Sequence, residues 1–239
     1  MDRTELALFA KLCSITYLDV DKAIIPFSQL GFKVIKFFNN QGAQGYLLNN
    51  GEYNVLSFRG TEGTRSDIIA DIELETTKEY SATREYLGEV HRGFKKQLDA
   101  IWPDIIKTIE QNPGRLIITG HSLGAGIGTI AASRLQPETL VTFGSPRVGN
   151  RSFVNNLTVT HHRVQNNNDP VTSVPLPIHG YRHHGTHVYM DYTGKFAHYN
   201  FLKEYFSRLI RVITFKEMLI DYIKDHFLEN YIKQLEKDY

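Results

Sequence analysis

Hydrophobic positions along this chain recur with two different periods, and together they predict both helices and strands. Residues 2–17 and 94–110 place apolar side chains three or four positions apart, which predicts two amphipathic helices. From residue 199 onward the sequence is again mostly helical in pattern. Short apolar runs bounded by turn residues predict strands at 32–38, 45–48, 53–58, 116–119, 140–143, 158–164 and 188–192.

The order of these elements predicts the class of fold. Asn50-Gly51 separates two early strands and is the strongest short signal for an antiparallel hairpin. The later strands alternate with helices, which is typical of a mostly parallel sheet flanked by helices. Residues 62–90 are polar and acidic, so an irregular segment is expected there. No repeat or linker divides the chain, and we expect one α/β domain over residues 1–239.

Composition narrows the classes of function and the compartment. The 239 residues are 41% hydrophobic and 22% charged, and the formal net charge is +1. A chain without a strong field of one sign is not expected to bind nucleic acid. One cysteine, Cys13, excludes an internal disulfide. The first residues lack a leader pattern and no apolar run reaches about 18 residues, so a cytoplasmic placement is expected.

The segment Gly120-His121-Ser122-Leu123-Gly124 lies between a predicted strand and a run of small residues, 125–135, that can form a helix. Strand, tight glycine-flanked turn and helix are together the context of a nucleophile elbow, with a serine hydroxyl at the tip of the turn. The helix behind Ser122 would direct N–H groups at an oxyanion formed there. The plain alternative is a glycine-rich turn between packed elements.

A serine hydroxyl becomes a nucleophile when a general base accepts its proton and an acid orients that base. After a nucleophile elbow the chain order is serine, acid, histidine. Asp169 fits the acid because it follows the strand at 158–164 and precedes Pro170, which biases it away from helical geometry. Asp191 competes, although it falls within the strand predicted at 188–192. The residues alone leave five candidate bases open: His183, His184, His187, His198 and His226.

Three of these histidines, His183, His184 and His187, are close enough in sequence to raise the question of a metal site. They lack the glutamate-containing helical pair of a zinc protease. On a strand, the neighbours His183 and His184 would point to opposite faces. We therefore expect no metal, and a serine hydrolase needs no other cofactor.

Several motifs, taken in order, resemble the class 3 lipases, the fungal-type triacylglycerol lipases that also include plant phospholipases A1. The resemblance extends over residues 30–232. The matching segments are Phe58-Arg59-Gly60-Thr61, His91-Arg92-Gly93-Phe94, Gly120-His121-Ser122-Leu123-Gly124, Phe143-Gly144-Ser145-Pro146-Arg147-Val148-Gly149-Asn150, Asp169-Pro170-Val171 with Leu176-Pro177, Tyr181-x-His183-x-Gly185, and His226 with Tyr231.

The resemblance implies an α/β-hydrolase fold and a catalytic triad of Ser122, Asp169 and His226. It also implies an oxyanion hole made by the backbone N–H groups of Leu123 and Thr61. The implied activity is hydrolysis of carboxylic ester bonds in lipids or small esters by a triacylglycerol lipase or esterase. A phospholipase A1, a short-chain carboxylesterase and a non-catalytic lipase-like binding module are the alternatives.

The chain departs from the family's pattern around the expected lid. It has no tryptophan near residues 67–71, no cysteine pair, and few apolar residues between 62 and 90. We expect residues 62–75 and a helix over 199–216 to line the acyl pocket. That helix also carries lysine and arginine, so transient contact with a lipid surface is the alternative to packing on the sheet. The sequence gives no oligomeric state.

Overall fold

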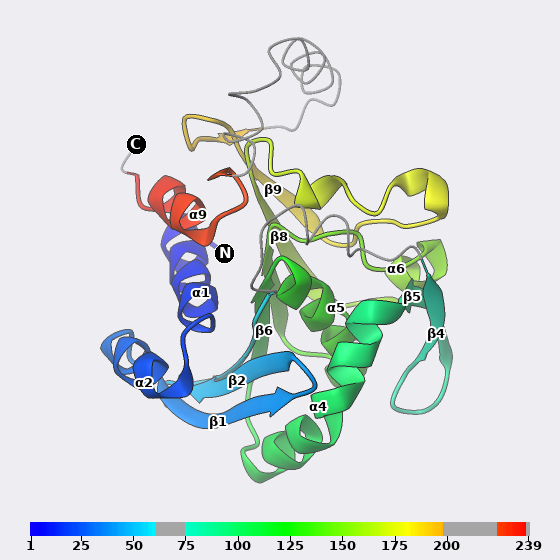
Figure 1. Ribbon diagram of the computed structural model, residues 1–239, viewed down its shortest axis with the longest axis horizontal. Helices are drawn as coiled ribbons and strands as arrows, with labels where there is room; N and C mark the ends of the chain where they lie inside the picture. The colour runs from blue at the N-terminus through cyan, green and yellow to red at the C-terminus, as the bar shows by residue number, and fades with distance from the viewer. Residues whose placement is uncertain (61–74, 198–223, 238–239) are drawn as a thin grey trace.

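A mixed eight-stranded sheet crosses the part of the molecule that the structure describes. The structure is a computed structural model that describes residues 1–60, 75–197 and 224–237 (Figure 1). The sheet order is β1-β2-β3-β6-β7-β8-β9-β10. These strands are β1 (Lys33–Asn40), β2 (Ala43–Asn49), β3 (Asn54–Phe58), β6 (Leu116–His121), β7 (Thr139–Phe143), β8 (Thr160–Asn166), β9 (Thr186–Met190) and β10 (Phe196–Ala197).

The direction of the strands follows the predicted pattern. β1, β2 and β3 pair antiparallel, whereas β3, β6, β7, β8 and β9 pair parallel in that order. The hairpin predicted at Asn50-Gly51 is confirmed, because Asn49 pairs with Asn54 across it. The carboxyl ends of parallel strands meet at one edge, which is where an open α/β sheet places its ligands. The elbow and the loop that carries Asp169 both begin at that edge.

Helices cover both faces of the sheet (Figure 1). α1 (Arg3–Ile15), α2 (Val20–Gln29) and α9 (Leu228–Leu235) lie on one face, and α4 (Arg92–Gln111) and α5 (Leu123–Leu135) on the other. Successive strand residues alternate between the two cores, so Leu56 packs with α4 and α5 while Val55 packs with α1. The shorter helices are α6 (Arg151–Asn156), η1 (Val171–Ser173) and η2 (Pro177–His179).

The structure contains several elements that the sequence did not predict. α2, α6 and β10 were not predicted, and a hairpin of β4 (Thr76–Tyr80) and β5 (Tyr86–His91) replaces part of the segment expected to be irregular. The pattern of β4 misleads because Glu79 is 1% exposed although it is charged. Arg134 donates to both of its oxygens at 2.6 and 3.1 Å, so an ion pair from a distant helix replaces apolar burial.

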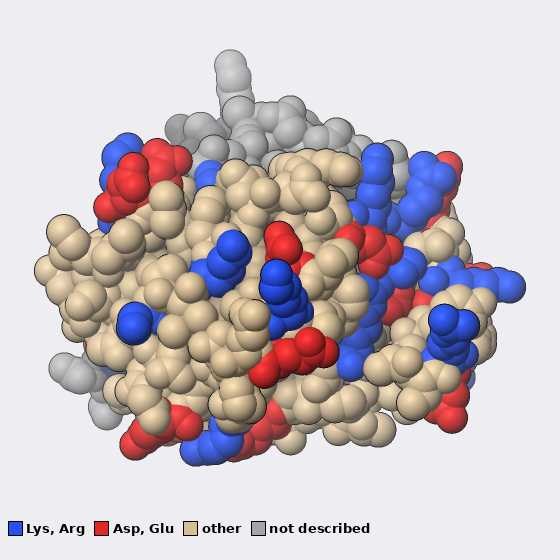
Figure 2. All heavy atoms as spheres, turned by 90° about the horizontal axis from the view of Figure 1, so that it is seen from below, with Lys and Arg blue, Asp and Glu red and all other residues tan. Residues whose placement is uncertain are grey.

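Other expectations concern strand ends and surface. β9 ends at Met190, so the expectation that Asp191 lies within a strand is wrong. Residues 199–216 and most of 62–75 lie outside the described residues. Charges of both signs are interspersed on the face seen in Figure 2. Within the described ranges, no helix combines the length and apolar character that a bilayer crossing demands.

Candidate active site

Ser122 occupies the tight turn between β6 and α5. Its backbone has φ 58° and ψ −127°, a region that a non-glycine residue adopts only when its surroundings enforce it. The N–H of Ser122 donates to the carbonyl of Phe143 at 3.0 Å, which ties the turn to β7. A Cβ at Gly124 would overlap the backbone oxygen of Phe58, so only glycine allows α5 to start this close to β3. The motif therefore forms the elbow geometry that its sequence predicts.

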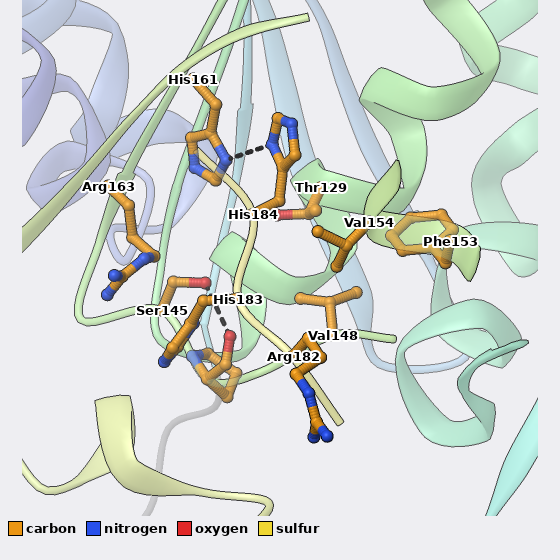
Figure 3. Close-up of a pocket in the computed structure, with 11 residues that line it drawn as sticks. Thr129, Ser145, Val148, Phe153, Val154, His161, Arg163, Arg182, His183 and His184 are labelled. Carbon is orange, nitrogen blue, oxygen red and sulfur yellow. Dashed lines mark hydrogen bonds between the residues drawn. The ribbon is translucent and has the colours of Figure 1, made fainter. Parts of the chain in front are cut away.

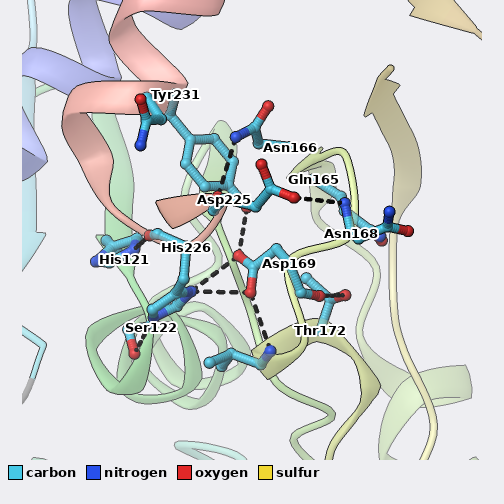
Figure 4. A network of polar contacts seen from close by, with 12 residues as sticks. His121, Ser122, Gln165, Asn166, Asn168, Asp169, Thr172, Asp225, His226 and Tyr231 are labelled. Atoms are coloured by element: carbon cyan, nitrogen blue, oxygen red, sulfur yellow. Dashed lines mark hydrogen bonds and ion pairs between the residues drawn. The ribbon is translucent and has the colours of Figure 1, made fainter. Parts of the chain in front are cut away.

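Three distant side chains meet at this turn (Figure 4). The Ser122 hydroxyl donates to Nε2 of His226 at 2.9 Å, although the two residues are 104 positions apart. Nδ1–H of His226 donates to both carboxylate oxygens of Asp169, at 3.0 and 2.8 Å. The exposed fractions are 1% for Ser122, 4% for His226 and 0% for Asp169, so all three interactions lie away from bulk water. This series of hydrogen bonds can move a proton away from the serine oxygen.

Asp169 is a fully buried carboxylate with several donors. The hydroxyl of Tyr231 donates to its Oδ2 at 2.6 Å, and the N–H of Val171 donates to its Oδ1 at 2.9 Å. Burial alone would raise the pKa of Asp169, but His226 and the Tyr231 hydroxyl outweigh it and hold that pKa below its ordinary value. The carboxylate therefore stays ionised and fixes the Nδ1–H tautomer of His226.

His121, the second residue of the elbow, holds the backbone of His226. Its Nε2–H donates to the carbonyl of His226 at 2.8 Å, and its Nδ1 accepts from the Tyr17 hydroxyl, also at 2.8 Å. Burial and, next, the neighbouring His226 lower the pKa of His121 to about 3. The ring is therefore neutral near pH 7, which agrees with one nitrogen donating and the other accepting.

Of the two residues expected to form an oxyanion hole, the structure describes Leu123 but not Thr61. Leu123 is the first residue of α5, so its backbone N–H has no acceptor within the helix and lies at the positive end of the helix dipole. Thr61 lies outside the described residues. The chain leading to it passes the elbow, because a Cβ at Gly60 would lie 2.8 Å from the carbonyl oxygen of His121.

Two of the alternative bases lie in a separate pocket beside β8 (Figure 3). His183 Nε2–H donates to the carbonyl of Thr172 at 2.8 Å, and His184 shares a hydrogen bond of 3.1 Å with His161. Burial is the largest cause that lowers the pKa of each of these three histidines, so they are neutral. Neither His183 nor His184 bonds to Ser122; among the described residues, no group of three metal-binding side chains is found.

The remaining candidates also lie apart from the serine. His187 Nε2–H donates to Oε1 of Gln165 at 3.0 Å. Asp191 accepts from the N–H groups of Thr193 and Lys195 and stabilises the turn before β10. His198 lies outside the described residues. Of the bases left open by the pattern, the one that contacts Ser122 in the described structure is His226.

Sequence reasoning missed two side chains that support this arrangement, Tyr17 and Asp225. Tyr17 is the last residue of the predicted first helix, and its contact with His121 spans 104 positions. Asp225 stands directly before His226 and accepts a hydrogen bond from Asn167. The position of Asp225 next to a candidate base could have drawn attention to it, whereas no local sequence pattern marks Tyr17.

Comparison with known proteins gives the chain a family. The profile of the family Lipase (class 3) matches residues 55–179. A secreted mono- and diacylglycerol lipase of Fusarium solani is 36% identical over 114 residues, which are 43% of this chain and 34% of the relative. Another, from Penicillium camembertii, is 35% identical over 141 residues, 54% of this chain and 45% of the relative. The chain thus spans less than half the length of these curated relatives.

A solved structure agrees with these matches. The crystal structure of a lipase from Rhizopus microsporus var. chinensis superposes with a TM-score of 0.66 at 25% identity, covering 78% of this chain and 74% of the other. This similarity confirms the expected α/β-hydrolase fold, with its mostly parallel sheet and antiparallel strands at the N-terminal side.

The relatives also correct one expectation. Those from Fusarium and Penicillium are named as secreted enzymes, which contradicts the cytoplasmic placement expected from the sequence. The lack of a leader pattern was therefore a poor guide to the compartment. With the profile matched over more than half of the chain and the fold shared with a solved lipase, this chain belongs to the class 3 lipases.

Proposed function

We propose that this chain hydrolyses the carboxylic ester bonds of lipids, with Ser122 as nucleophile, His226 as general base and Asp169 as the acid that orients it. One observation carries the proposal: the unbroken line of hydrogen bonds from the serine hydroxyl through the imidazole to an ionised carboxylate. The mechanism uses neither a metal nor an organic cofactor.

The first half-reaction forms an acyl-enzyme. Nε2 of His226 takes the hydroxyl proton while Oγ of Ser122 attacks the ester carbonyl carbon, and the carbonyl oxygen becomes an oxyanion. The ionised Asp169 stabilises the imidazolium. When the tetrahedral intermediate collapses, the carbon–oxygen bond to the alcohol breaks and His226 returns the proton to the departing alcohol oxygen.

The second half-reaction uses water. Nε2 of His226 removes a proton from a water molecule as its oxygen attacks the acyl carbon. Collapse of this intermediate releases the fatty acid, and the proton returns to Oγ of Ser122. In both steps the backbone N–H of Leu123 would donate to the oxyanion, with that of Thr61 as the second donor. Each such donor contributes on the order of 10²–10³ in rate.

Lipid esters are the proposed substrates because class 3 lipases act on them and the curated relatives are named as mono- and diacylglycerol lipases. We propose further that residues 1–239 act as one catalytic domain. Support comes from α1 and α9, which lie far apart in sequence and pack against each other beside the base. Any contact with a lipid surface would be transient.

The test combines active-site labelling with ester hydrolysis. The wild type should react with a fluorophosphonate probe and hydrolyse p-nitrophenyl esters. Ser122→Ala should lose the label and about 10⁴-fold or more of kcat, because the members of a triad act as a unit. Ser133→Ala is the matched control, since Ser133 is also buried, lies on α5, the helix that follows Ser122, and donates to the carbonyl of Ile130. Equal activity of Ser122→Ala and the wild type would refute the proposal.

A further inference from the structure

Asp225 is joined to the loop before Asp169 by three hydrogen bonds. Its carboxylate Oδ2 accepts from Nδ2 of Asn167 at 2.9 Å and from the N–H of Asn168 at 3.3 Å. Its backbone carbonyl accepts from Nδ2 of Asn166 at 3.0 Å (Figure 4). Thus a single residue is bonded to all three members of the Asn166–Asn168 run.

Position along the chain gives these contacts their meaning. Asp225 directly precedes His226, and Asn168 directly precedes Asp169. We call the segment that carries Asp225 and His226 the base loop, and the segment Asn166–Asp169 the acid loop. Two adjacent sets of hydrogen bonds join these loops: one between the side chains of His226 and Asp169, and one between Asp225 and the three asparagines. The first set orients the imidazole ring, and the second holds the backbone from which that ring extends.

The geometry points to Asp225 as a positioning residue for the proposed reaction: it fixes the main chain of His226 so that Nε2 stays at hydrogen-bonding distance from the Ser122 hydroxyl. This inference rests on the proposed function for its effect on rate. Asp225 acts through the backbone of its neighbour. A displacement of about 1 Å at a reacting group can cost about 10²-fold in rate, which makes this backbone a sensitive point.

The carbonyls of Asp225 and His226 are both used as acceptors. Asn166 donates to the first at 3.0 Å, and His121 donates to the second at 2.8 Å. Two consecutive peptide units are thus held from opposite sides, by the acid loop and by the elbow. The interaction that the ring donates to Asp169 would by itself leave the ring free to move with its loop, whereas these bonds fix the loop itself.

The backbone conformation of Asn167 suits it to donate a hydrogen bond to Asp225. Its φ is 42°, a left-handed conformation that asparagine tolerates better than most residues, and this conformation presents its amide to Asp225. Asn167→Gly keeps the backbone conformation accessible and removes only the amide donor. That substitution therefore tests the bond from the partner's side without touching Asp225.

The experiment compares Asp225→Ala, Asp225→Asn and Asn167→Gly with the wild type. We expect kcat for a p-nitrophenyl ester to fall about 10- to 100-fold in Asp225→Ala with KM changed less than about 2-fold, since transition-state geometry rather than substrate binding is affected. Asp225→Asn retains an acceptor oxygen and should recover most of kcat. Asn167→Gly should lose less than Asp225→Ala.

Asp191→Ala is the matched control. The Asp191 carboxylate likewise accepts hydrogen bonds within a turn, in its case from two backbone N–H groups, but it has no hydrogen bond to Ser122 or His226. Its loss should lower the melting temperature and leave kcat unchanged. If the loss of Asp225 only destabilised a loop, Asp225→Ala and Asp191→Ala would change kcat and melting temperature in the same way. A fall in kcat in Asp225→Ala alone therefore separates positioning from stability.

A second readout does not depend on activity. The proton between Nδ1 of His226 and Asp169 should give a low-field NMR resonance in the wild type, and Asp225→Ala should shift or broaden it. Folded Asp225→Ala with wild-type kcat and an unchanged resonance overturns the inference. If Asp225→Ala does not fold, Asn167→Gly decides by the same criteria. A wild type without esterase activity whose resonance still responds to Asp225→Ala refutes the proposed function and leaves the positioning intact; an unresponsive resonance refutes the positioning.

Discussion

Tyr231→Phe removes one hydroxyl from the fully buried surroundings of Asp169 and leaves the ring that packs beside Phe143 in place. In the wild type this hydroxyl donates at 2.6 Å to Oδ2, the oxygen that also accepts from His226 at 2.8 Å. The substitution creates little cavity, so its effect reports on the hydrogen bonding of the hydroxyl rather than on packing. Asp169 keeps the N–H of Val171 and the imidazole as donors.

The expected magnitude follows from the charge on the acceptor. A hydrogen bond to an ionised group contributes about 1.5–3 kcal/mol to the free energy of unfolding. For a chain of this size each kcal/mol corresponds to about 2–4 °C in melting temperature, so a loss of about 2 kcal/mol predicts a decrease of about 4–8 °C. We expect kcat to fall about 10-fold, because the carboxylate is held less firmly against His226 while the contact itself remains.

Thermal unfolding across a pH series shows in which direction the stabilising effect of Asp169 changes with pH. The pKa of Asp169 lies below its ordinary value of 3.8, so its stabilising effect is present above that value and is lost as the pH falls through the folded-state pKa. Tyr231→Phe raises the folded-state pKa. The difference in melting temperature between wild type and variant should therefore be constant above about pH 5 and shrink on acidification.

Tyr46→Phe is the matched control, since Tyr46 is also buried and its hydroxyl donates to a neutral acceptor, the carbonyl of Leu18, at 3.1 Å. This variant should lose about 0.5–1.5 kcal/mol with no dependence on acidic pH and no loss of kcat. If Tyr231→Phe matched the wild type in melting temperature and kcat, or if the two variants behaved alike, the reasoning would be wrong.

Three further predictions concern the surroundings of the site. Gly144 has φ +56°, and a Cβ there would lie 2.6 Å from Oδ2 of Asp169 and 2.9 Å from Nδ1 of His226, so Gly144→Ala should lower kcat about 10²-fold in an ester assay; activity within 2-fold would contradict this. Tyr17→Phe leaves Nδ1 of the buried His121 without its donor and should cost about 1–3 kcal/mol in urea unfolding. Burial lowers the pKa of His161 well below 6.5, so the unfolded state takes up protons first as the pH falls. The free energy of unfolding should then decrease below about pH 6.5 by up to about 1.4 kcal/mol per pH unit for each such histidine, and a profile without slope between pH 7 and 5 would exclude it.

Much of the sheet could be predicted because its signals are local. The runs that became β6 and β7 are buried on both faces and appear in the sequence as short apolar segments. Gly120 and Gly124 mark the turn at Ser122, and Asp169 follows from chain order after β8. These elements are defined by residues that lie next to one another, so no knowledge of distant contacts is needed.

The rest depends on contacts between distant residues. Glu79 lies in β4, whose polar sequence gives no strand signal, and its partner Arg134 lies 55 positions away. The choice of His226 among five histidines required either a family resemblance or the spatial meeting of two loops that are 57 residues apart. The bond between Asp225 and Asn167 has the same origin. The catalytic roles themselves stay predictions until the variants are measured.

The packing of α1 against α9 joins the segment that carries the imidazole of His226 to the first helix of the chain. Arg3 donates to the carbonyl of Gln234 at 2.6 Å, so the first helix holds the segment that carries His226. Local opening of such a segment costs less free energy than melting the whole sheet. A molecule in which this segment has detached, together with the hydrogen bonds of Asp225 and His121 that hold it, would keep its strands and its serine and still lack esterase activity, so an intact sheet does not guarantee a working site.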